Sequence, residues 1–156
     1  MAGVDMSIRL NSTRFGDVEI DPRSVIEFAD GLIGLGGTRY ALLTLAPDTP
    51  FVWLHSLDDG SLALPVTNPY RFFPEFRLAL TDEDAERLGV DESTPVDVYV
   101  TVRASANLAE VMANQRAPIV VHDGRGAQVI NQAPGMALRA PLFPPETVNA
   151  VGQSAA

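Results

Sequence analysis

PFVWLHSLDDGSLALPVTNPYRFFPEFRLALT, residues 50–81, is the stretch on which the predicted fold depends. Residues 51–56 and 62–66 each alternate in side-chain type with the two-residue period of a β-strand. Between them, Asp58 to Ser61 predict a turn, because an Asp-Gly pair readily supplies the positive φ angles of tight hairpins. Asn68-Pro69 ends the second strand, since proline lacks the N–H that a sheet requires. The stretch therefore predicts an antiparallel hairpin.

An aromatic corner bounded by prolines follows this hairpin, and it is the best candidate for a binding surface. If the corner is extended, Phe72 and Phe73 point to opposite faces. One of the pair, Phe72 by preference, is then exposed, while the other joins Trp53 and Leu64 in the core. An apolar anchor inside a charged rim is typical of protein-binding patches. The candidate partner-binding residues are Asp58, Asp59, Asn68, Pro69, Tyr70, Phe72, Phe73, Glu75, Glu83 and Glu86.

The rest of the chain favours short strands. Alternation or compact apolar runs predict strands near residues 6–10, 18–20, 25–28, 40–45, 96–102, 119–122 and 127–131. Residues 119–131 form a second predicted hairpin around Asp123-Gly124. Many short strands at close spacing, with little helix between them, indicate an all-β, mainly antiparallel sandwich or small barrel.

One short helix interrupts the strands. Thr81 or Asp82 is a suitable N-cap, acidic residues in the first turn complement the helix dipole, and Gly89 is a good terminator. Residues 104–116 predict a loop with one helical turn. We expect a single domain over residues 1–145 and a loosely ordered tail over 146–156, where proline, alanine and polar residues show no periodicity.

Charge and composition narrow the function classes. The chain has 156 residues, a net charge of −9 and no cysteine. Residues 48–97 contain eleven acidic residues and three arginines, so this third of the chain carries a net charge of −8. Such a surface repels the phosphates of nucleic acids and favours a basic partner. No apolar run approaches the roughly 20 residues of a membrane span, and no signal peptide is visible, so a cytoplasmic location is expected.

No catalytic, metal or cofactor motif stands out. The glycine-rich residues 31–37 lack the lysine and hydroxyl residue of a phosphate-binding loop, and no G-x-S-x-G elbow is present. His55 with Asp58 and Asp59 is the one candidate polar cluster. It leaves open an alternative function as a small β-domain hydrolase or a sugar-binding module. The interpretation that we favour is a non-enzymatic binding domain without a cofactor.

Five strings in order resemble one known family. They are TRFGDVEID (13–21), VIEFADGLIGL (25–35), PFVWLHSLDDGSLALPVTNPYRFFPEF (50–76), LTDEDAERLGV (80–90) and APIVVHDGRGAQVI (117–130), and together they are similar to the flagellar assembly factor FliW family. The most specific of them is the central string. ASANLAEVMANQR (104–116) departs from the family pattern, being longer and less regular.

This resemblance implies a small barrel-like β-fold and a non-enzymatic role in the cytoplasm. It implies binding to flagellin and, where present, to the RNA-binding translational regulator CsrA. Sequestering CsrA frees the flagellin message for translation, and newly made flagellin then competes for the FliW protein. Neither direct nucleic-acid binding nor membrane binding is expected.

Overall fold

A closed ring of seven strands forms the centre of the protein. The computed structural model describes residues 7–143 except 34, 36 and 45–47. The ring strands are β3 (Val25–Glu27), β4 (Arg39–Leu43), β5 (Phe51–Ser56), β6 (Ala63–Thr67), β7 (Asp97–Arg103), β9 (Ile119–His122) and β10 (Arg125–Gln128). β7 pairs with both β6 and β9, which closes the ring. Only the β10–β3 pair within it is parallel. The predicted all-β, mainly antiparallel barrel is confirmed.

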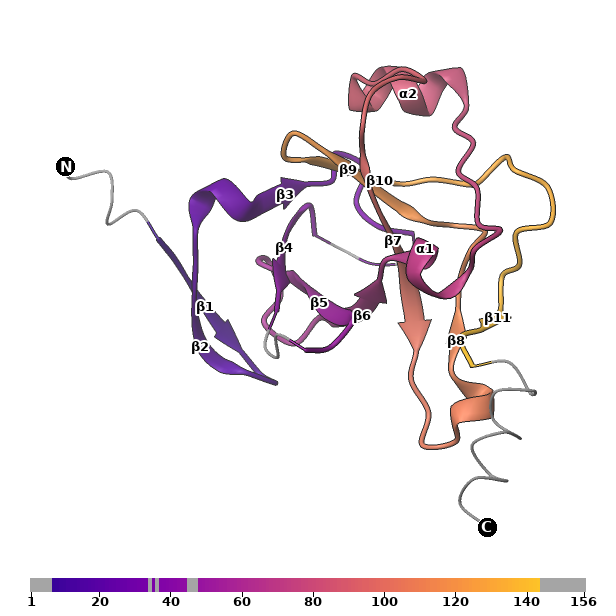
Figure 1. The fold of residues 1–156 in the computed structure, drawn as a ribbon. Coiled ribbons are helices and arrows are strands. Elements are labelled where there is room, and N and C mark those ends of the chain that lie inside the picture. The colour runs from indigo at the N-terminus through magenta and orange to yellow at the C-terminus, as the bar shows by residue number, and fades with distance from the viewer. Residues whose placement is uncertain (1–6, 34, 36, 45–47, 144–156) are drawn as a thin grey trace, which may run out of the picture.

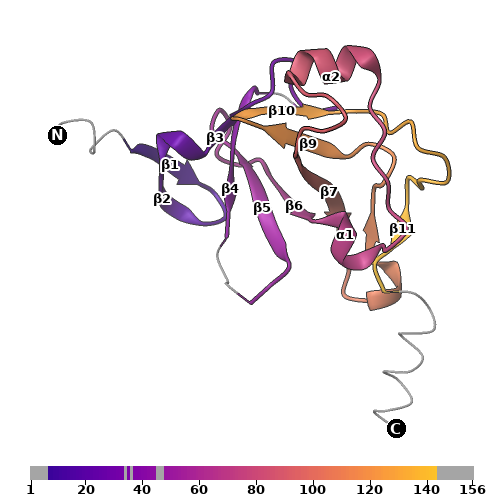
Figure 2. The same ribbon diagram turned by 45° about the horizontal axis from the view of Figure 1, so that its top comes forward.

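The other elements lie outside this ring (Figures 1 and 2). They are the antiparallel ribbon β1 (Ile8–Ser12) and β2 (Gly16–Ile20), the 3-10 turns η2 (Pro22–Ser24) and η3 (Leu108–Glu110), the helices α1 (Pro69–Phe72) and α2 (Asp82–Leu88), and the short strands β8 (Met112–Ala113) and β11 (Ala140–Pro141). The predicted hairpins β5–β6 and β9–β10, the helix at 82–88 and the helical turn within 104–116 are all present. Among the described residues, no helix has both the length and the apolar character to cross a bilayer.

The interior of the barrel is filled by one apolar cluster. Its buried members come from five of the seven ring strands and from the loop after β3: Ile26, Phe28, Leu32, Tyr40, Leu54, Val66, Ile119 and Val121, with the partly buried Tyr99 of β7 packed against them. β10 contributes Gly126 on this face. A Cβ built on Gly126 would lie 2.5 Å from the Phe28 ring, so the ring occupies the space that a side chain would need. The barrel is therefore filled by side chains, as expected for so few strands.

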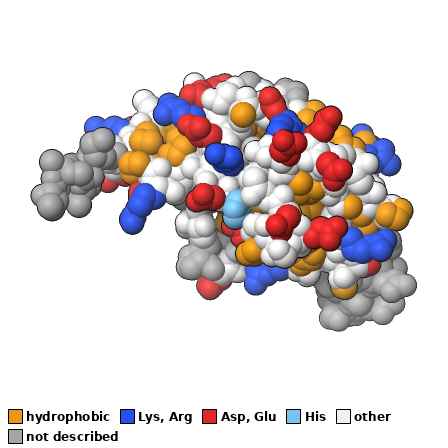
Figure 3. All heavy atoms as spheres, turned by 90° about the horizontal axis from the view of Figure 1, so that it is seen from above, with side chains coloured by type: hydrophobic (Ala, Val, Ile, Leu, Met, Phe, Trp, Pro, Cys, Tyr) orange, Lys and Arg blue, Asp and Glu red, His pale blue; other side chains and the backbone are white. Residues whose placement is uncertain are grey.

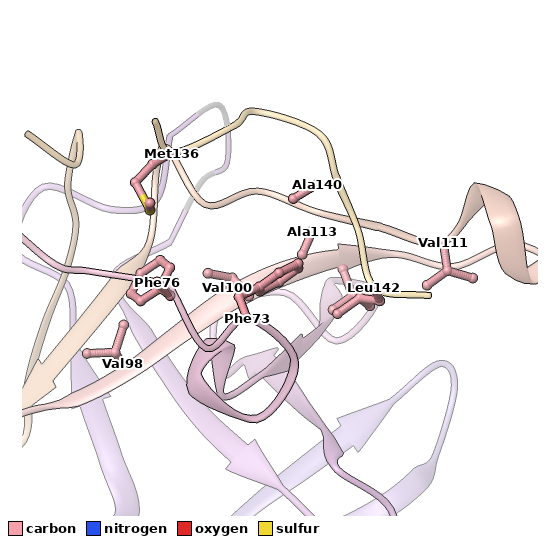
Figure 4. Close-up of a cluster of buried hydrophobic side chains, with 10 residues drawn as sticks. Phe73, Phe76, Val98, Val100, Val111, Ala113, Met136, Ala140 and Leu142 are labelled. Carbon is pink, nitrogen blue, oxygen red and sulfur yellow. The ribbon is translucent and has the colours of Figure 1, made fainter. Parts of the chain in front are cut away.

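Three further clusters cover the outside of the barrel, because the outward faces of several ring strands are also apolar. The ribbon β1–β2 covers Ala41 and Leu43 of β4. Helix α2 places Leu88 against Val120 and Val129. The largest outer cluster covers β7 (Figure 4) and contains Phe73, Phe76, Val98, Val100, Val102, Val111, Ala113, Met136, Ala140 and Leu142.

In β7, the alternation of valines with other residues does not separate a buried face from an exposed one, because the outer clusters also cover this strand. The valines at 98, 100 and 102 face outward and are buried under other segments, whereas Tyr99 contacts the barrel interior. Both faces of this strand are thus packed. Leu142 is 3% exposed, so the chain is still part of the core one residue after Pro141. The tail predicted at 146–156 lies outside the described residues.

Candidate partner-binding site

The aromatic corner is helical, and this corrects the expectation of an extended segment. Asn68 is the N-cap of α1, and its Oδ1 accepts a hydrogen bond from the Tyr70 N–H at 2.9 Å. Pro69 occupies the first turn, where its fixed φ suits a helix and its missing N–H costs nothing. The Phe73 N–H closes the turn by donating to the Pro69 carbonyl at 2.9 Å. Successive side chains therefore point about 100° apart rather than to opposite faces.

This geometry makes Tyr70, and not Phe72, the exposed aromatic residue of the corner. Tyr70 is 51% exposed, and its ring lies edge-on against buried Phe76 with centroids 5.2 Å apart. Phe72 is half-buried and stacks on Phe51 at 5.8 Å. Phe73 is buried, but in the outer cluster over β7, whereas Trp53 and Leu64 pack in two other clusters. The predicted exposure of Phe72 and the predicted core partners of Phe73 were therefore wrong.

Tyr70 lines a groove of about 810 Å³, which we call the acidic groove. Its lining is Tyr70, Leu78, Ala79, Leu80, Asp82, Ala85, Glu86, Val90, Asp91, Glu92, Thr94 and Val96. Half of these residues are aliphatic, four are carboxylates, and no described lining residue is basic. Figure 3, which looks down on α2, shows several acidic side chains next to apolar ones on this face, with some basic side chains among them. The groove is thus an apolar surface within an acidic rim.

Helix α2 holds one wall of the acidic groove in place. Thr81 caps its start by accepting a hydrogen bond from the Asp84 N–H at 3.1 Å, and Gly89 ends it in the left-handed conformation at φ 71°. Asp84 turns inward and pairs with Arg87, which also pairs with Asp30. In the described part of the chain, no ion pair is formed by the remaining α2 acids, namely Asp82, Glu83 and Glu86. Their charge is therefore free to act on a partner.

The pKa values of two residues that line this groove, Tyr70 and Asp91, are shifted. Partial burial raises the pKa of Tyr70, so its hydroxyl stays protonated near neutral pH and can donate a hydrogen bond. Hydrogen bonds from the Ser93 side chain and backbone, with further ones from Thr94, lower the pKa of the Asp91 carboxyl. Asp91 is therefore ionised near neutral pH, and its position is fixed by the turn that it stabilises.

Comparison with known proteins identifies this architecture. The FliW protein family model matches residues 9–142. A flagellar assembly factor FliW of Alkaliphilus metalliredigens (strain QYMF) is 34% identical over 115 residues, which are 72% of this chain and 71% of the relative. The FliW of Desulfitobacterium hafniense (strain Y51) is 30% identical over 139 residues, covering 87% and 91%.

The chain belongs to the FliW family.

A solved structure agrees with this assignment. The crystal structure of a flagellar assembly factor FliW superposes with a TM-score of 0.79 at 29% identity, covering 88% of this chain and 98% of that one. The resemblance inferred from the five sequence strings is confirmed, as is the small β-barrel. The FliW relatives are named as assembly factors and not as enzymes, in agreement with the non-enzymatic interpretation.

In this FliW chain, the predicted partner-binding residues do not form one cluster. Asp58 and Asp59 lie in the turn before β6, and Asn68 follows its last residue, so the length of β6, about 17 Å, separates the two groups. Glu83 is exposed on α2 beside the acidic groove, and Glu75 is exposed just after α1, but neither lines the groove. Of the ten predicted residues, only Tyr70 and Glu86 line it.

Asp58 and Asp59 each stabilise local backbone structure. Asp58 Oδ2 accepts hydrogen bonds from the N–H groups of Thr38 at 2.9 Å and Arg39 at 3.1 Å, and these bonds lower the pKa of its carboxyl. The Ser61 side chain and backbone N–H lower the pKa of Asp59 in the same way. Both carboxyls stay ionised at neutral pH, so neither can serve as a general acid.

His55 is likewise structural, and this removes the basis for the hydrolase or sugar-binding alternative. The ring is fully buried under the β1–β2 ribbon. Its Nδ1 donates to the Ser56 carbonyl at 2.7 Å, and its Nε2 lies 2.8 Å from Ser12 Oγ. The Ser12 oxygen also accepts the Phe15 N–H at 3.0 Å, which fixes the ribbon turn over β5. Among the described residues, no group of three potential metal ligands occurs.

The residues that sequence reasoning missed are those of the acidic groove outside the corner. Leu78, Leu80 and Val90 carried no binding signal, because isolated aliphatic residues in irregular segments are usually core, and Val96 was counted as part of the predicted strand 96–102. Asp91 and Glu92 were counted only as part of the acidic excess. Nothing in the sequence showed that residues 78–80 and 90–96 lie on either side of one groove.

Proposed function

We propose that this FliW-family chain is a non-enzymatic binding protein for flagellin and, in organisms that possess it, for CsrA. It acts in the cytoplasm, the location that the family resemblance implies. Binding of CsrA would release the flagellin message for translation, and newly made flagellin would compete for the same binding protein. The level of flagellin would then regulate its own synthesis.

The acidic groove is the observation that supports this proposal. Its floor offers leucine, valine and alanine side chains together with half-exposed Tyr70, a residue type enriched at binding hot spots. Its rim carries four carboxylates and no described base. A surface of this composition binds a partner through apolar contacts, and its acidic rim selects for a positively charged partner.

An acidic rim is suited to an RNA-binding partner such as CsrA. Proteins that bind RNA present arginine and lysine to the phosphates, so their binding face is positively charged. The same field that repels RNA from this chain attracts such a face and raises the association rate. The proposal therefore requires no contact between this chain and RNA.

The test is the association rate of purified CsrA with charge variants of the full chain. In the variant Glu75→Gln, Glu83→Gln, Glu86→Gln, three negative charges are removed around the acidic groove. The control variant Asp17→Asn, Glu19→Gln, Glu110→Gln removes three exposed charges on β2 and η3. Biolayer interferometry at several salt concentrations measures the rates.

We expect the first variant to associate at least about threefold more slowly than the control at low salt, with the difference vanishing when the Debye length falls to about 3 Å near 1 M salt. Equal rates for the two variants, or a rate insensitive to salt, would assign these acids to solubility alone. A parallel titration with purified flagellin shows whether the two partners exclude each other, as the proposal requires.

A further inference from the structure

A second groove opens where the barrel wall divides. β7 pairs with β9 only through residues 97–99, and its last residues pair instead with β8, which runs away from the ring. The space between β7–β8 and the start of β9 holds about 740 Å³. Residues 101–103, 112–114, 116, 117, 128, 130, 138 and 139 line it, together with Ile33, Leu35 and Leu64. We call this space the basic groove.

The basic groove exposes an unusual amount of apolar side chain. Five large hydrophobic residues of the described chain are strongly exposed, and Ile33, Ile130 and Leu138 of this groove are three of them, at 57%, 52% and 52%. The Ile33 N–H donates to Gln128 Oε1 at 2.8 Å, which ties that residue to β10 across 95 positions of sequence. Apolar side chains gathered in this way mark an interaction surface, whereas scattered ones do not.

The charge of this groove is opposite to that of the protein as a whole. Arg103, Arg116 and Arg139 line it, and no carboxylate is among its described lining residues. All three are exposed. Across the described residues, the ion pairs of arginine involve Arg23, Arg39 and Arg87, and none involves these three. In a chain with net charge −9, three arginines that pair with no carboxylate of the described residues thus line one apolar surface.

We propose that the basic groove docks an acidic, apolar segment of a protein partner, and that it acts independently of the acidic groove. The aliphatic floor takes apolar side chains, while the guanidinium groups pair with carboxylates, for which their planar donors are suited. The charge complementarity selects an acidic partner. A nucleic acid is disfavoured because the net charge of −9 repels its backbone. Two grooves of opposite charge allow one chain to hold two different partner segments.

The probe is a 14-residue helical peptide with leucine on one face and glutamate on the other, compared with the same peptide carrying lysine in place of glutamate. Binding to the ¹⁵N-labelled full chain is followed by amide chemical shifts, and affinity by fluorescence anisotropy. We expect the glutamate peptide to shift the amides of Ile130, Leu138 and their neighbours, and to bind more weakly as salt rises. The lysine peptide should leave these amides unshifted.

Two variants test the role of the lining. Replacing Arg103, Arg116 and Arg139 together by glutamine should weaken glutamate-peptide binding about tenfold or more, because each rim charge contributes only a modest share. Leu138→Ser, at an exposed position, should weaken it while the melting temperature stays within a few degrees. The control Arg9→Gln, Arg14→Gln, Arg23→Gln removes three positive charges in and beside the β1–β2 ribbon and should bind as the wild type does.

Several results would overturn the proposal. They are equal binding of the lysine peptide, no shifts at millimolar glutamate peptide, and unchanged affinity of the arginine triple variant. Binding of a 15-nucleotide oligouridylate that the triple variant abolishes would identify a nucleic-acid site instead. Concentration-dependent dimerisation abolished by Leu138→Ser would identify a self-association face. Loss of flagellin or CsrA binding through the acidic groove leaves this prediction unaffected, so the two proposals fail separately.

Discussion

Replacing Tyr70 by alanine should mainly weaken partner binding, whereas replacing Phe73 by alanine should mainly lower stability, although the two residues lie only three positions apart in one turn. Tyr70 is 51% exposed, and its ring packs in a T-shaped arrangement against buried Phe76. Phe73 is 6% exposed and packs among the valines of β7. The first substitution removes groove surface, and the second removes core.

The magnitudes follow from this burial. Truncating a buried phenylalanine costs about 3–5 kcal/mol, partly through the cavity that remains. Truncating Tyr70 removes about half of the stabilisation that a fully buried side chain of this size would give, together with one aromatic ring contact. The combined cost is roughly 1–2 kcal/mol of unfolding free energy. At about 2–4 °C per kcal/mol for a chain of this size, the melting temperature should fall by roughly 6–20 °C in Phe73→Ala and by roughly 2–8 °C in Tyr70→Ala. A hot-spot residue loses about 2 kcal/mol or more of binding, a factor of about thirty in Kd.

Thermal unfolding by circular dichroism and titration with flagellin and with CsrA measure the two effects in the same preparations. Tyr70→Phe is the matched control, since it keeps the ring and removes only the hydroxyl. We expect Tyr70→Ala to be folded at 25 °C and to bind at least one partner about thirtyfold more weakly, with Tyr70→Phe close to wild type. A folded Tyr70→Ala that binds both partners normally would refute the assignment of the acidic groove.

Three further outcomes are expected. Far-ultraviolet circular dichroism should be dominated by β-structure, and residues 1–145, if they form one domain as we propose, should unfold in one cooperative transition; two separated transitions would contradict this. Gly126→Ala should cost about 1–3 kcal/mol through the clash with Phe28, and Phe28→Leu in the same chain should recover part of that loss; additive losses would contradict the clash. Because the folded pKa of Asp58 is lowered, its contribution is present above the unfolded value near 3.9 and is lost as pH falls through the folded pKa. Asp58→Asn should thus be less stable than wild type by up to about 1 kcal/mol at pH 7, and chemical denaturation at pH 7 and pH 2.5 should show the gap closing; a constant gap would refute the electrostatic origin.

Local chemistry in the sequence determined most of the secondary structure. The alternation of side chains predicted β7, and an Asp-Gly turn predicted each of the hairpins β5–β6 and β9–β10. Thr81 and Gly89 determined the two ends of α2. These signals act within a few residues, so no distant contact is needed to interpret them. The same strings carried the family resemblance that the FliW comparisons confirm.

Tertiary structure alone decided which residues face a partner. Asn68 and Pro69 are as suitable for starting a helix as for ending a strand, and the helical choice turned Tyr70 rather than Phe72 outward. The valines of β7 had to be buried, but their position outside the barrel depends on segments 73–76, 111–113 and 136–142 packing over them. Both grooves are formed by segments that are distant in sequence, and their opposite charges follow from which residues the barrel brings together. Pairing across such distances depends on the packing of the whole chain, which no local pattern encodes.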